Sequence, residues 1–363
     1  MPTAMHSSPE TCTSTLARMR AVLALHLDLE QGSPFWIECA RVRGVRADDL
    51  ASLDDLALLG PMDEDAMRTR PLTDFIPRRV LAERRRLIPS ETGGATGAPK
   101  LAVFTEEEFH AGFVAPFVRV AEHIGFPRDG RWLFVGPTGP HIIGRAARHL
   151  ARVMGADEPF TVDFDPRWHR RLLPGSVAER RHIDHIVEQA LRVMRRVEIT
   201  VLFITPSVLA SLTPLLSDAH RMAVGGIHFG GQALEPDARA AFREAFPRAV
   251  QVAGYGNSMV GVCMEVPRRD HTGLSYHAPA PRHVVRLLAD PTRSLTREVE
   301  AGMRGRVLVH RLDESFLLLN MVERDEATRL PGSPEARALG LAREGIGDPG
   351  PPQSGSTVQG GIY

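Results

Sequence analysis

The sequence has almost no lysine. Of its 44 basic residues, only Lys100 is a lysine and all the others are arginine, a bias typical of a GC-rich genome. Lysine differs from arginine in presenting a compact ammonium group on a flexible stem. Lys100 is therefore a candidate for a role that a planar guanidinium cannot fill, although a single lysine can also survive by chance.

Other features are scarce as well, and each scarcity excludes a class of protein. Three widely separated cysteines, Cys12, Cys39 and Cys263, indicate neither a disulfide framework nor a zinc cluster. Acidic and basic residues balance at 44 each, which removes the electrostatic basis for binding nucleic acid or an anionic membrane. No apolar run reaches the ~20 residues of a membrane-spanning helix, and the first residues lack the features of a signal peptide. We therefore expect a cytoplasmic protein.

The pattern of apolar residues predicts an α/β fold. The chain has 363 residues, of which 43% are hydrophobic and 24% charged, a composition typical of globular domains. From Leu101 onward, expected strands alternate with expected helices, which indicates parallel β-sheets flanked by helices. After Val262, short strands and turns predict a smaller antiparallel, barrel-like part. We expect an N-terminal helix and tail (1–30), a large domain (31–330) and a turn-rich C-terminal tail (331–363).

The most informative segment is TGGATGAPK, residues 92–100, just before an expected strand at residues 101–105. Its glycines and threonines allow backbone N–H groups and hydroxyls to converge on an anion, and Lys100 adds a positive charge. It is not a Walker A loop, because Leu101 stands where a serine or threonine would bind magnesium. An ordinary glycine-rich turn is the alternative, but the position of the only lysine favours phosphate binding.

Together with other segments in the same order, this one resembles the adenylate-forming (acyl-CoA synthetase) superfamily. Residues 92–100 are similar to its phosphate loop, [ST]-S-G-[ST]-T-G-x-P-K; GGQAL (230–234) is similar to its adenine loop, G-G-E-P-L; and YGNSM (255–259) is similar to Y-G-x-[ST]-E. Asp325 stands where the family has the aspartate that binds the ribose hydroxyls. His141, in PTGPHIIG, resembles the P-x-x-H-x-x-G segment that lines the acyl pocket.

Within that superfamily, residues 34–62 are similar to the amino-terminal region of phenylacetate–CoA ligases, and VDFDPRWHRRL resembles a branch associated with phenazine antibiotic biosynthesis. The resemblance implies the fold of the family's large N-terminal domain. It also implies ATP-dependent activation of an aromatic or heteroaromatic carboxylic acid to an acyl-adenylate, in secondary metabolism. ATP and Mg²⁺ are the implied cofactors.

The resemblance assigns roles to individual residues. Lys100 and Thr96 would be catalytic. The nucleotide would be bound by Thr92, Gly93, Gly94, Gly97, Gly230, Gly231, Gln232, Ala233, Tyr255, Gly256, Asn257, Ser258 and Asp325. The acid would be bound by His141, Phe229, Gly254 and Met259. Structural alternatives stay open for three of them: Tyr255 as a core aromatic, Asp325 as a surface acid, and His141 as a histidine at a helix start.

Several departures from the family pattern bear on activity. Met259 replaces a glutamate that helps to bind magnesium, and a thioether is a poor ligand for that hard cation. Gly93 and Ala95 replace residues with hydroxyls. Only 38 residues follow Asp325, none of them lysine, so the family's C-terminal lid domain is not expected. Thioester formation by this chain alone should then be weak or absent.

These departures keep two alternatives open. The first is a catalytically impaired protein that binds a nucleotide or an aryl ligand. The second is a half-enzyme that needs a partner domain. Coenzyme A, a carrier protein or a partner enzyme could accept the acyl group, and a homodimer is one alternative for the oligomeric state. No metal site is expected from the protein alone, because His182 and His185 share the expected helix 177–196 with no evident third ligand.

Overall fold

The computed structural model describes residues 11–93, 97–139 and 141–352, which form two compact units. Of the described residues, the antiparallel unit contains 11–88, Ala102–Gly112 and 266–352. The parallel unit contains Pro89–Leu101 and Phe113–Glu265. The chain passes between the two units within β1 (Leu87–Glu91) and β2 (Leu101–Thr105), which pair in a two-stranded sheet.

The parallel unit is built on a sheet with the strand order β8-β7-β6-β5-β3-β4. Neighbouring strands from β4 to β7 pair in parallel, and β8 returns antiparallel beside β7. Every residue of β3, β5 and β6 is buried, as expected for strands covered on both faces. The strands are β3 (Trp132–Val135), β4 (Phe160–Val162), β5 (Val201–Ile204), β6 (Gly226–Phe229), β7 (Val250–Asn257) and β8 (Gly261–Glu265).

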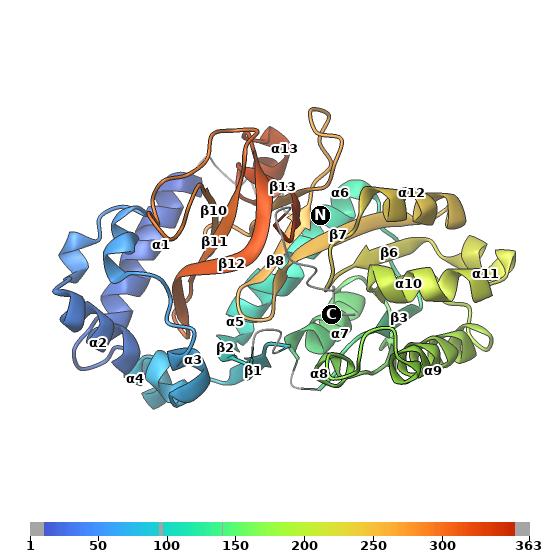
Figure 1. The fold of residues 1–363 in the computed structure, drawn as a ribbon, viewed down its shortest axis with the longest axis horizontal. Helices are drawn as coiled ribbons and strands as arrows, with labels where there is room; N and C mark the ends of the chain where they lie inside the picture. The colour runs from blue at the N-terminus through green and yellow to red at the C-terminus, as the bar shows by residue number, and fades with distance from the viewer. Residues whose placement is uncertain (1–10, 94–96, 140, 353–363) are drawn as a thin grey trace, which may run out of the picture. The chain divides into compact units, whose positions relative to one another are not determined.

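Helices connect these strands and lie on both sides of them in Figure 1. The predicted helix 177–196 is confirmed as α9, which ends at Met194 and begins after Ser176, whose hydroxyl accepts the N–H of Glu179. Among the others, α6 packs beside α7 and α9 beside α10. The helices of this unit are α6 (Ala115–Ile124), α7 (Ile142–Val153), α8 (Pro166–His169), α9 (Val177–Met194), α10 (Pro206–Leu212), α11 (Asp218–Ala223) and α12 (Pro236–Ala245).

The antiparallel unit holds the strand order β10-β11-β12-β13-β9, with antiparallel pairing throughout. This confirms the antiparallel pairing that the sequence predicts for the strands after Val262. Its strands are β9 (Ser275–His277), β10 (His283–Leu288), β11 (Arg304–Leu312), β12 (Leu317–Leu330) and β13 (Gly345–Gly350). Its α-helices are α1 (Thr11–His26), α2 (Pro34–Arg43), α3 (Ala66–Thr69), α4 (Arg78–Ala82), α5 (Glu106–Phe109) and α13 (Pro334–Ala338).

Residues 331–352 contain α13 and β13, where the sequence indicates only turns. The sequence of β13, GIGDPG, looks like a turn because half of its residues are glycine. Glycine is nevertheless required, since a Cβ at Gly345 would lie 2.6 Å from Cε1 of His277. Backbone pairing of β13 with β12 and β9 supplies the stabilisation that its side chains do not.

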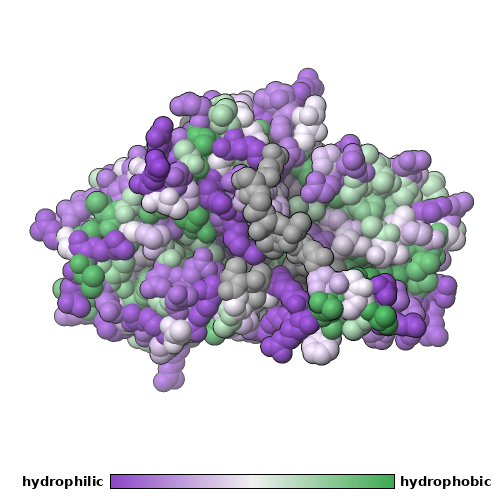
Figure 2. Space-filling view, viewed as in Figure 1, coloured by the Kyte–Doolittle hydropathy of each residue, from purple (hydrophilic) through white to green (hydrophobic). Residues whose placement is uncertain are grey.

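Exposed apolar side chains are interspersed with hydrophilic ones on the face drawn in Figure 2. Single exposed apolar side chains of this kind are normal on protein surfaces. Within the residues described, no helix combines the length and apolar character needed to cross a bilayer.

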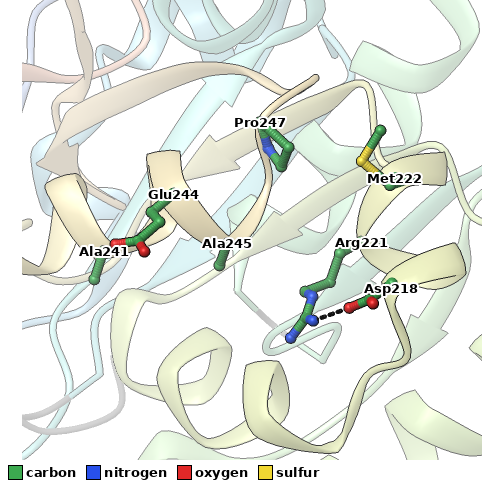
Figure 3. Close-up of a pocket in the computed structure, with 7 residues that line it drawn as sticks. All are labelled: Asp218, Arg221, Met222, Ala241, Glu244, Ala245 and Pro247. Carbon is green, nitrogen blue, oxygen red and sulfur yellow. Dashed lines mark hydrogen bonds and ion pairs between the residues drawn. The ribbon is translucent and has the colours of Figure 1, made fainter.

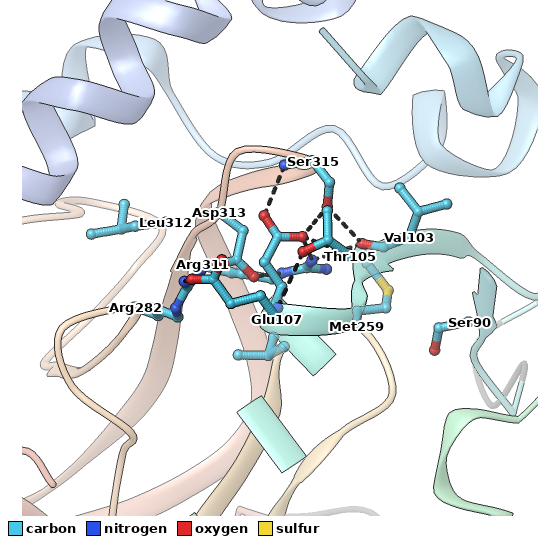
Figure 4. A network of polar contacts seen from close by, with 12 residues as sticks. Ser90, Val103, Thr105, Glu107, Met259, Arg282, Arg311, Leu312, Asp313 and Ser315 are labelled. Carbon is cyan, nitrogen blue, oxygen red and sulfur yellow. Dashed lines mark hydrogen bonds and ion pairs between the residues drawn. The ribbon is translucent and has the colours of Figure 1, made fainter. Parts of the chain in front are cut away.

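Buried charges form a network in the antiparallel unit (Figure 4). Arg311 is fully buried and donates from Nε to Oδ2 of Asp313 at 2.7 Å and from Nη2 to the carbonyl of Val103 at 2.7 Å. Arg282 donates to the other oxygen of Asp313 at 2.8 Å. Burial by itself raises the pKa of Asp313, but the charges of Arg311 and Arg282 more than offset burial and hold that pKa at about 2.

Replacing Asp313 by asparagine should lower the free energy of unfolding by about 3–5 kcal/mol, because two guanidinium groups lose the charge that compensates their burial. Urea unfolding at pH 7 measures the loss. Since the pKa of Asp313 lies below the ordinary 3.8, its carboxylate stabilises the fold above pH 3.8, and this stabilisation is lost as the pH falls through about 2.

The matched control is Asp270→Asn, which breaks an ion pair between Arg268 and a carboxylate that is 57% exposed. That variant should unfold at the same urea concentration as the wild type. Equal stability of Asp313→Asn and the wild type would show that the buried network contributes nothing.

Candidate active site

The carboxyl ends of the parallel strands bring together segments that are far apart in sequence. From β3 the chain moves to β4, which lies next to β3 on one side. It then continues through β5, β6 and β7, which lie in that order on the other side of β3. Ligands in such sheets bind outside the carboxyl ends of the strands, at the point where the strand order changes direction. That point lies between β3, which leads to His141, and β5, which leads to Ser207.

Hydrogen bonds join the loops at this edge of the sheet. After β5, the N–H of Ser207 donates to Oε1 of Gln232, which follows β6, at 3.2 Å. After β7, the hydroxyl of Ser258 donates to the carbonyl of Glu91, at the end of β1, at 3.1 Å. Ser90 in turn donates to the carbonyl of Ser258. The expected adenine-side segments and the base of the glycine-rich loop are therefore held in the same part of the unit.

The glycine-rich loop is closed at its base by Thr92 and Lys100. The N–H of Thr92 donates to the carbonyl of Lys100 at 3.0 Å, and the N–H of Lys100 donates to Oγ1 of Thr92 at 2.9 Å. Lys100 is only 8% exposed. Gly97 has a φ of +136°, which requires glycine. Gly94 and Thr96 lie outside the described residues, so their expected roles stay predictions.

The segment after β6 approaches its neighbours closely. Phe229 is buried and stacks on Phe242 with ring centroids 5.4 Å apart. A Cβ at Gly230 would lie 3.2 Å from the ring of Phe203, and Gly231 has a φ of +80°. Ala233 is exposed and Gln232 is half-buried. The backbone of this segment is thus accessible from one side, while aromatic side chains pack against its other side.

The turn between β7 and β8 is built around Asn257. Its Oδ1 accepts the N–H groups of Met259 at 2.9 Å and Val260 at 3.0 Å. Gly256 must be glycine, because a Cβ there would lie 2.0 Å from a backbone oxygen of Gly261. Tyr255 is half-buried, and Met259 is fully buried. Asn257 therefore shapes the turn, and Met259 packs into the unit.

Gly254 lies on β7 beside the same turn. A Cβ at this position would lie 2.8 Å from Cγ1 of Val262 on β8 and 3.4 Å from Nε2 of His228 on β6. Glycine thus permits the close pairing of these strands. Its expected place in the acid pocket stays a prediction.

His141 lies within a charged cluster that sequence analysis did not identify. Arg167 donates from Nη1 to Glu91 at 2.8 Å and forms a forked pair with Asp165, both bonds being 2.9 Å long. Burial lowers the pKa of His141, and the positive charge of Arg167 lowers it further. Its Nε2 is buried and has no hydrogen-bond partner among the described residues. A neutral imidazole of this kind can satisfy a polar atom of a ligand.

Asp325 belongs to the antiparallel unit, so it is not among the residues that the parallel unit gathers. It lies on β12 in a bulge, since Leu308 pairs with Val322 while Arg306 pairs with Glu326. Its side chain is half-buried. Bulges often redirect a side chain at a functional site, and its role toward a ribose stays a prediction.

The described residues do not supply a protein cage for magnesium. Within them, no group of three or more histidine, cysteine, aspartate or glutamate residues could hold a metal ion. The carboxylates of Glu91 and Asp165 both pair with Arg167. Magnesium often binds largely through substrate phosphates and water, a mode that needs no such group.

A separate hollow of about 410 Å³ lies at the opposite edge of the sheet (Figure 3). It is formed by α11 and the end of α12, which precede β6 and β7. Its lining includes an ion pair between Arg221 and Asp218, together with Met222, Ala241 and Ala245. This composition offers little for catalysis.

Comparison with known proteins defines the fold. No protein-family model matches the sequence, and no curated protein sequence is significantly similar to it. Among solved structures, 2-hydroxyisobutyryl-CoA ligase with 2-HIB-AMP and CoA, in its thioesterification state, matches with a TM-score of 0.68 at 14% identity, over 93% of this chain and 66% of the ligase. An open conformation of that ligase matches with a TM-score of 0.64 at 16% identity, over 92% of this chain and 72% of the ligase.

The chain has the fold of the large N-terminal domain of adenylate-forming enzymes. This confirms the fold class that the sequence predicts. The chain spans just under two thirds of the length of the ligase in its thioesterification state.

Lys100→Met should weaken binding of pyrophosphate and ATP while leaving the protein folded. Methionine keeps the buried stem, and the backbone bonds to Thr92 are unaffected. Loss of a charge-assisted hydrogen bond costs about 1.5–3 kcal/mol, or roughly 10- to 100-fold in Kd. Isothermal calorimetry measures the Kd. Lys100→Arg should also bind poorly because its fork is planar and bulkier, and unchanged affinity of Lys100→Met would contradict a phosphate role.

Proposed function

We propose that the protein activates a carboxylic acid by adenylation. The carboxylate oxygen attacks the α-phosphorus of ATP, and the bond between this phosphorus and the oxygen that bridges to the β-phosphate breaks. Pyrophosphate leaves, and the acyl-adenylate is the other product. The observation that carries this proposal is the convergence of the base of the glycine-rich loop, His141, the GGQAL segment and the YGNSM turn at one edge of the parallel sheet.

This reaction needs charge neutralisation and in-line positioning more than it needs a nucleophilic side chain. Lys100, Thr92, Thr96 and the loop glycines would hold the phosphates. Gly230–Ala233 and Tyr255 would hold the adenine, with Gly256, Asn257 and Ser258 fixing the tyrosine's turn, and Asp325 would accept hydrogen bonds from the ribose. Magnesium would come with the nucleotide and neutralise phosphate charge.

The acid is proposed to be aromatic or heteroaromatic. The residues assigned to its pocket, His141, Phe229, Gly254 and Met259, are buried or half-buried, and only the imidazole among their side chains is polar. An imidazole with a lowered pKa and an unpartnered Nε2 suits a polar atom on an otherwise apolar ring. Similarity to phenylacetate–CoA ligases and to proteins associated with phenazine biosynthesis supports the same choice.

Coenzyme A is the proposed acceptor of the acyl group, with weak or no thioester formation by this chain alone. One structural neighbour is a CoA ligase that was solved with CoA bound, and a carrier protein or a partner enzyme is the alternative acceptor. A second candidate function is non-catalytic binding of a nucleotide or an aryl ligand. It is favoured by Met259, which is fully buried where a magnesium-binding glutamate would be expected.

Incubation with ATP, Mg²⁺, hydroxylamine and a panel of aryl acids tests adenylation directly. We expect pyrophosphate release that depends on the acid, together with the hydroxamate that hydroxylamine forms from an acyl-adenylate. Calorimetry on the same panel is the control. Binding of ATP and an acid without either product would favour the second candidate, and absence of binding would contradict both.

Asp325→Ala should weaken ATP binding by about 1.5–3 kcal/mol for each hydrogen bond lost, and should leave binding of the acid unchanged. Calorimetry with ATP and with 2′,3′-dideoxy-ATP separates a ribose role from a structural one. The substitution should cost affinity only for ATP, since the dideoxy nucleotide has no hydroxyls to lose. Equal losses for both nucleotides would make Asp325 structural.

A further inference from the structure

A guanidinium beside His141 joins two carboxylates from separate parts of the parallel unit. Arg167, on α8, donates from Nη1 to Oε1 of Glu91 at 2.8 Å, and Glu91 is the last residue of β1. The same guanidinium donates from Nε and Nη2 to the two oxygens of Asp165, each at 2.9 Å. Its charge and its fork are therefore used to hold these two carboxylates together.

Backbone hydrogen bonds define the position of His141. It is the N-cap of α7, and its carbonyl accepts the N–H of Gly144 at 3.3 Å. In the loop before it, the N–H of Thr138 donates to Oδ1 of Asp163 at 2.6 Å, which joins this loop to the segment that leads to Asp165. The imidazole is 7% exposed, and its buried Nε2 has no hydrogen-bond partner among the described residues. A polar atom of a bound molecule would satisfy this nitrogen.

Three charged side chains and one helix act on the charge of the imidazole. Burial lowers the pKa of His141, the guanidinium of Arg167 lowers it further, and the carboxylates of Asp165 and Glu91 raise it. The N-terminus of α7 is the positive end of a helix dipole, so it also disfavours a cation at the N-cap. Asp165 itself stays ionised at neutral pH, because its hydrogen bond from Arg167 lowers its pKa.

Arg167 acts on His141 in two ways. Its own charge opposes a proton on the imidazole, and its bonds compensate two carboxylates that would otherwise favour that proton. Without Arg167, the uncompensated charges of Glu91 and Asp165 would act on a nearly buried histidine. The charge of His141 therefore depends on this one side chain more than on either carboxylate alone.

We propose that Arg167 is a positioning residue that keeps His141 uncharged for contact with the acid, an inference that rests on the proposed function. An uncharged imidazole hydrogen-bonds a neutral group, such as a hydroxyl or a ring nitrogen, and offers no charge to a second carboxylate. The proposal thus narrows the acid to a monocarboxylate whose ring bears a neutral polar atom.

Nuclear magnetic resonance titration of the full chain, labelled with ¹³C-histidine, tests the role of Arg167. The His141 signal is assigned by its loss in His141→Gln. Arg167→Gln should raise the pKa of His141, because two carboxylates lose their compensating charge. Asp165→Asn should lower that pKa, because a negative charge is removed. Arg167→Lys keeps the positive charge and should leave that pKa closer to the wild-type value than Arg167→Gln does.

The opposite signs separate an electrostatic role from a merely structural one. A loosened site would expose the imidazole and raise the pKa of His141 in Arg167→Gln and Asp165→Asn alike, and that result would overturn the inference. An unchanged pKa in both variants would overturn it as well. The matched control is Arg148→Gln, which breaks an exposed ion pair between α7 and Glu158 and should leave the His141 titration as in the wild type.

Pairs of aryl acids with a hydroxyl or a second carboxylate at the same ring position test the narrowed acid class. By calorimetry at pH 7, the hydroxyl member should bind roughly 10-fold or more tightly, because a second carboxylate would be buried without a charged partner. Equal affinities within the pairs would contradict the narrowing. If no aryl acid binds, the proposed function fails, while the titrations still establish or refute the control of His141 by Arg167.

Discussion

Parallel pairing of the strands from β4 to β7 is the constraint on which the candidate site depends. In a parallel sheet all strands end at the same edge, so the segments that follow them meet there whatever their separation in sequence. Here the chain reverses its direction of travel across the sheet between β3 and β5. The loop after β3 and the loop after β5 therefore lead in opposite directions and need not cover each other's strands. Polar groups there, such as Nε2 of His141, can face a ligand.

The two units use charge differently. In the antiparallel unit, Arg311 and Asp313 are fully buried and compensate each other, so their charges contribute to folding and are inaccessible to a ligand. At the edge of the parallel sheet, Arg167 is held by Glu91 and Asp165, and Lys100 lies at the base of the glycine-rich loop. A chain with no net charge can in this way present a local cationic site for a polyanion.

Much of the fold could be predicted from the sequence because local pattern determines it. Continuous apolar runs such as VLFI and WLFV predict strands buried on both faces, and the amphipathic run from Val177 predicts α9. The strand β13 could not be predicted, because its glycine-rich sequence has no alternating hydrophobic pattern. Backbone hydrogen bonds to its neighbouring strands hold it in place. The division into two units also escapes a linear analysis, since each unit is assembled from separated stretches.

The candidate site could be predicted only where a motif is contiguous. The glycine-rich loop, GGQAL and YGNSM are each short enough to identify from sequence. Arg167 contacts the carboxylate of Glu91, which lies 76 positions away in the sequence. Arg170 contacts the backbone of Gly93, which lies 77 positions away. In a chain with 44 basic residues, nearly all of them arginine, no sequence signal singles out these two.

A crystal structure with a non-hydrolysable ATP analogue tests the central claim most directly, because it locates the phosphates. The account predicts the triphosphate against Thr92–Lys100, beside the carboxyl ends of the parallel strands, with the adenine near Gly230–Ala233. A nucleotide bound at the opposite edge of the sheet, near Arg221 and Glu244, would contradict it.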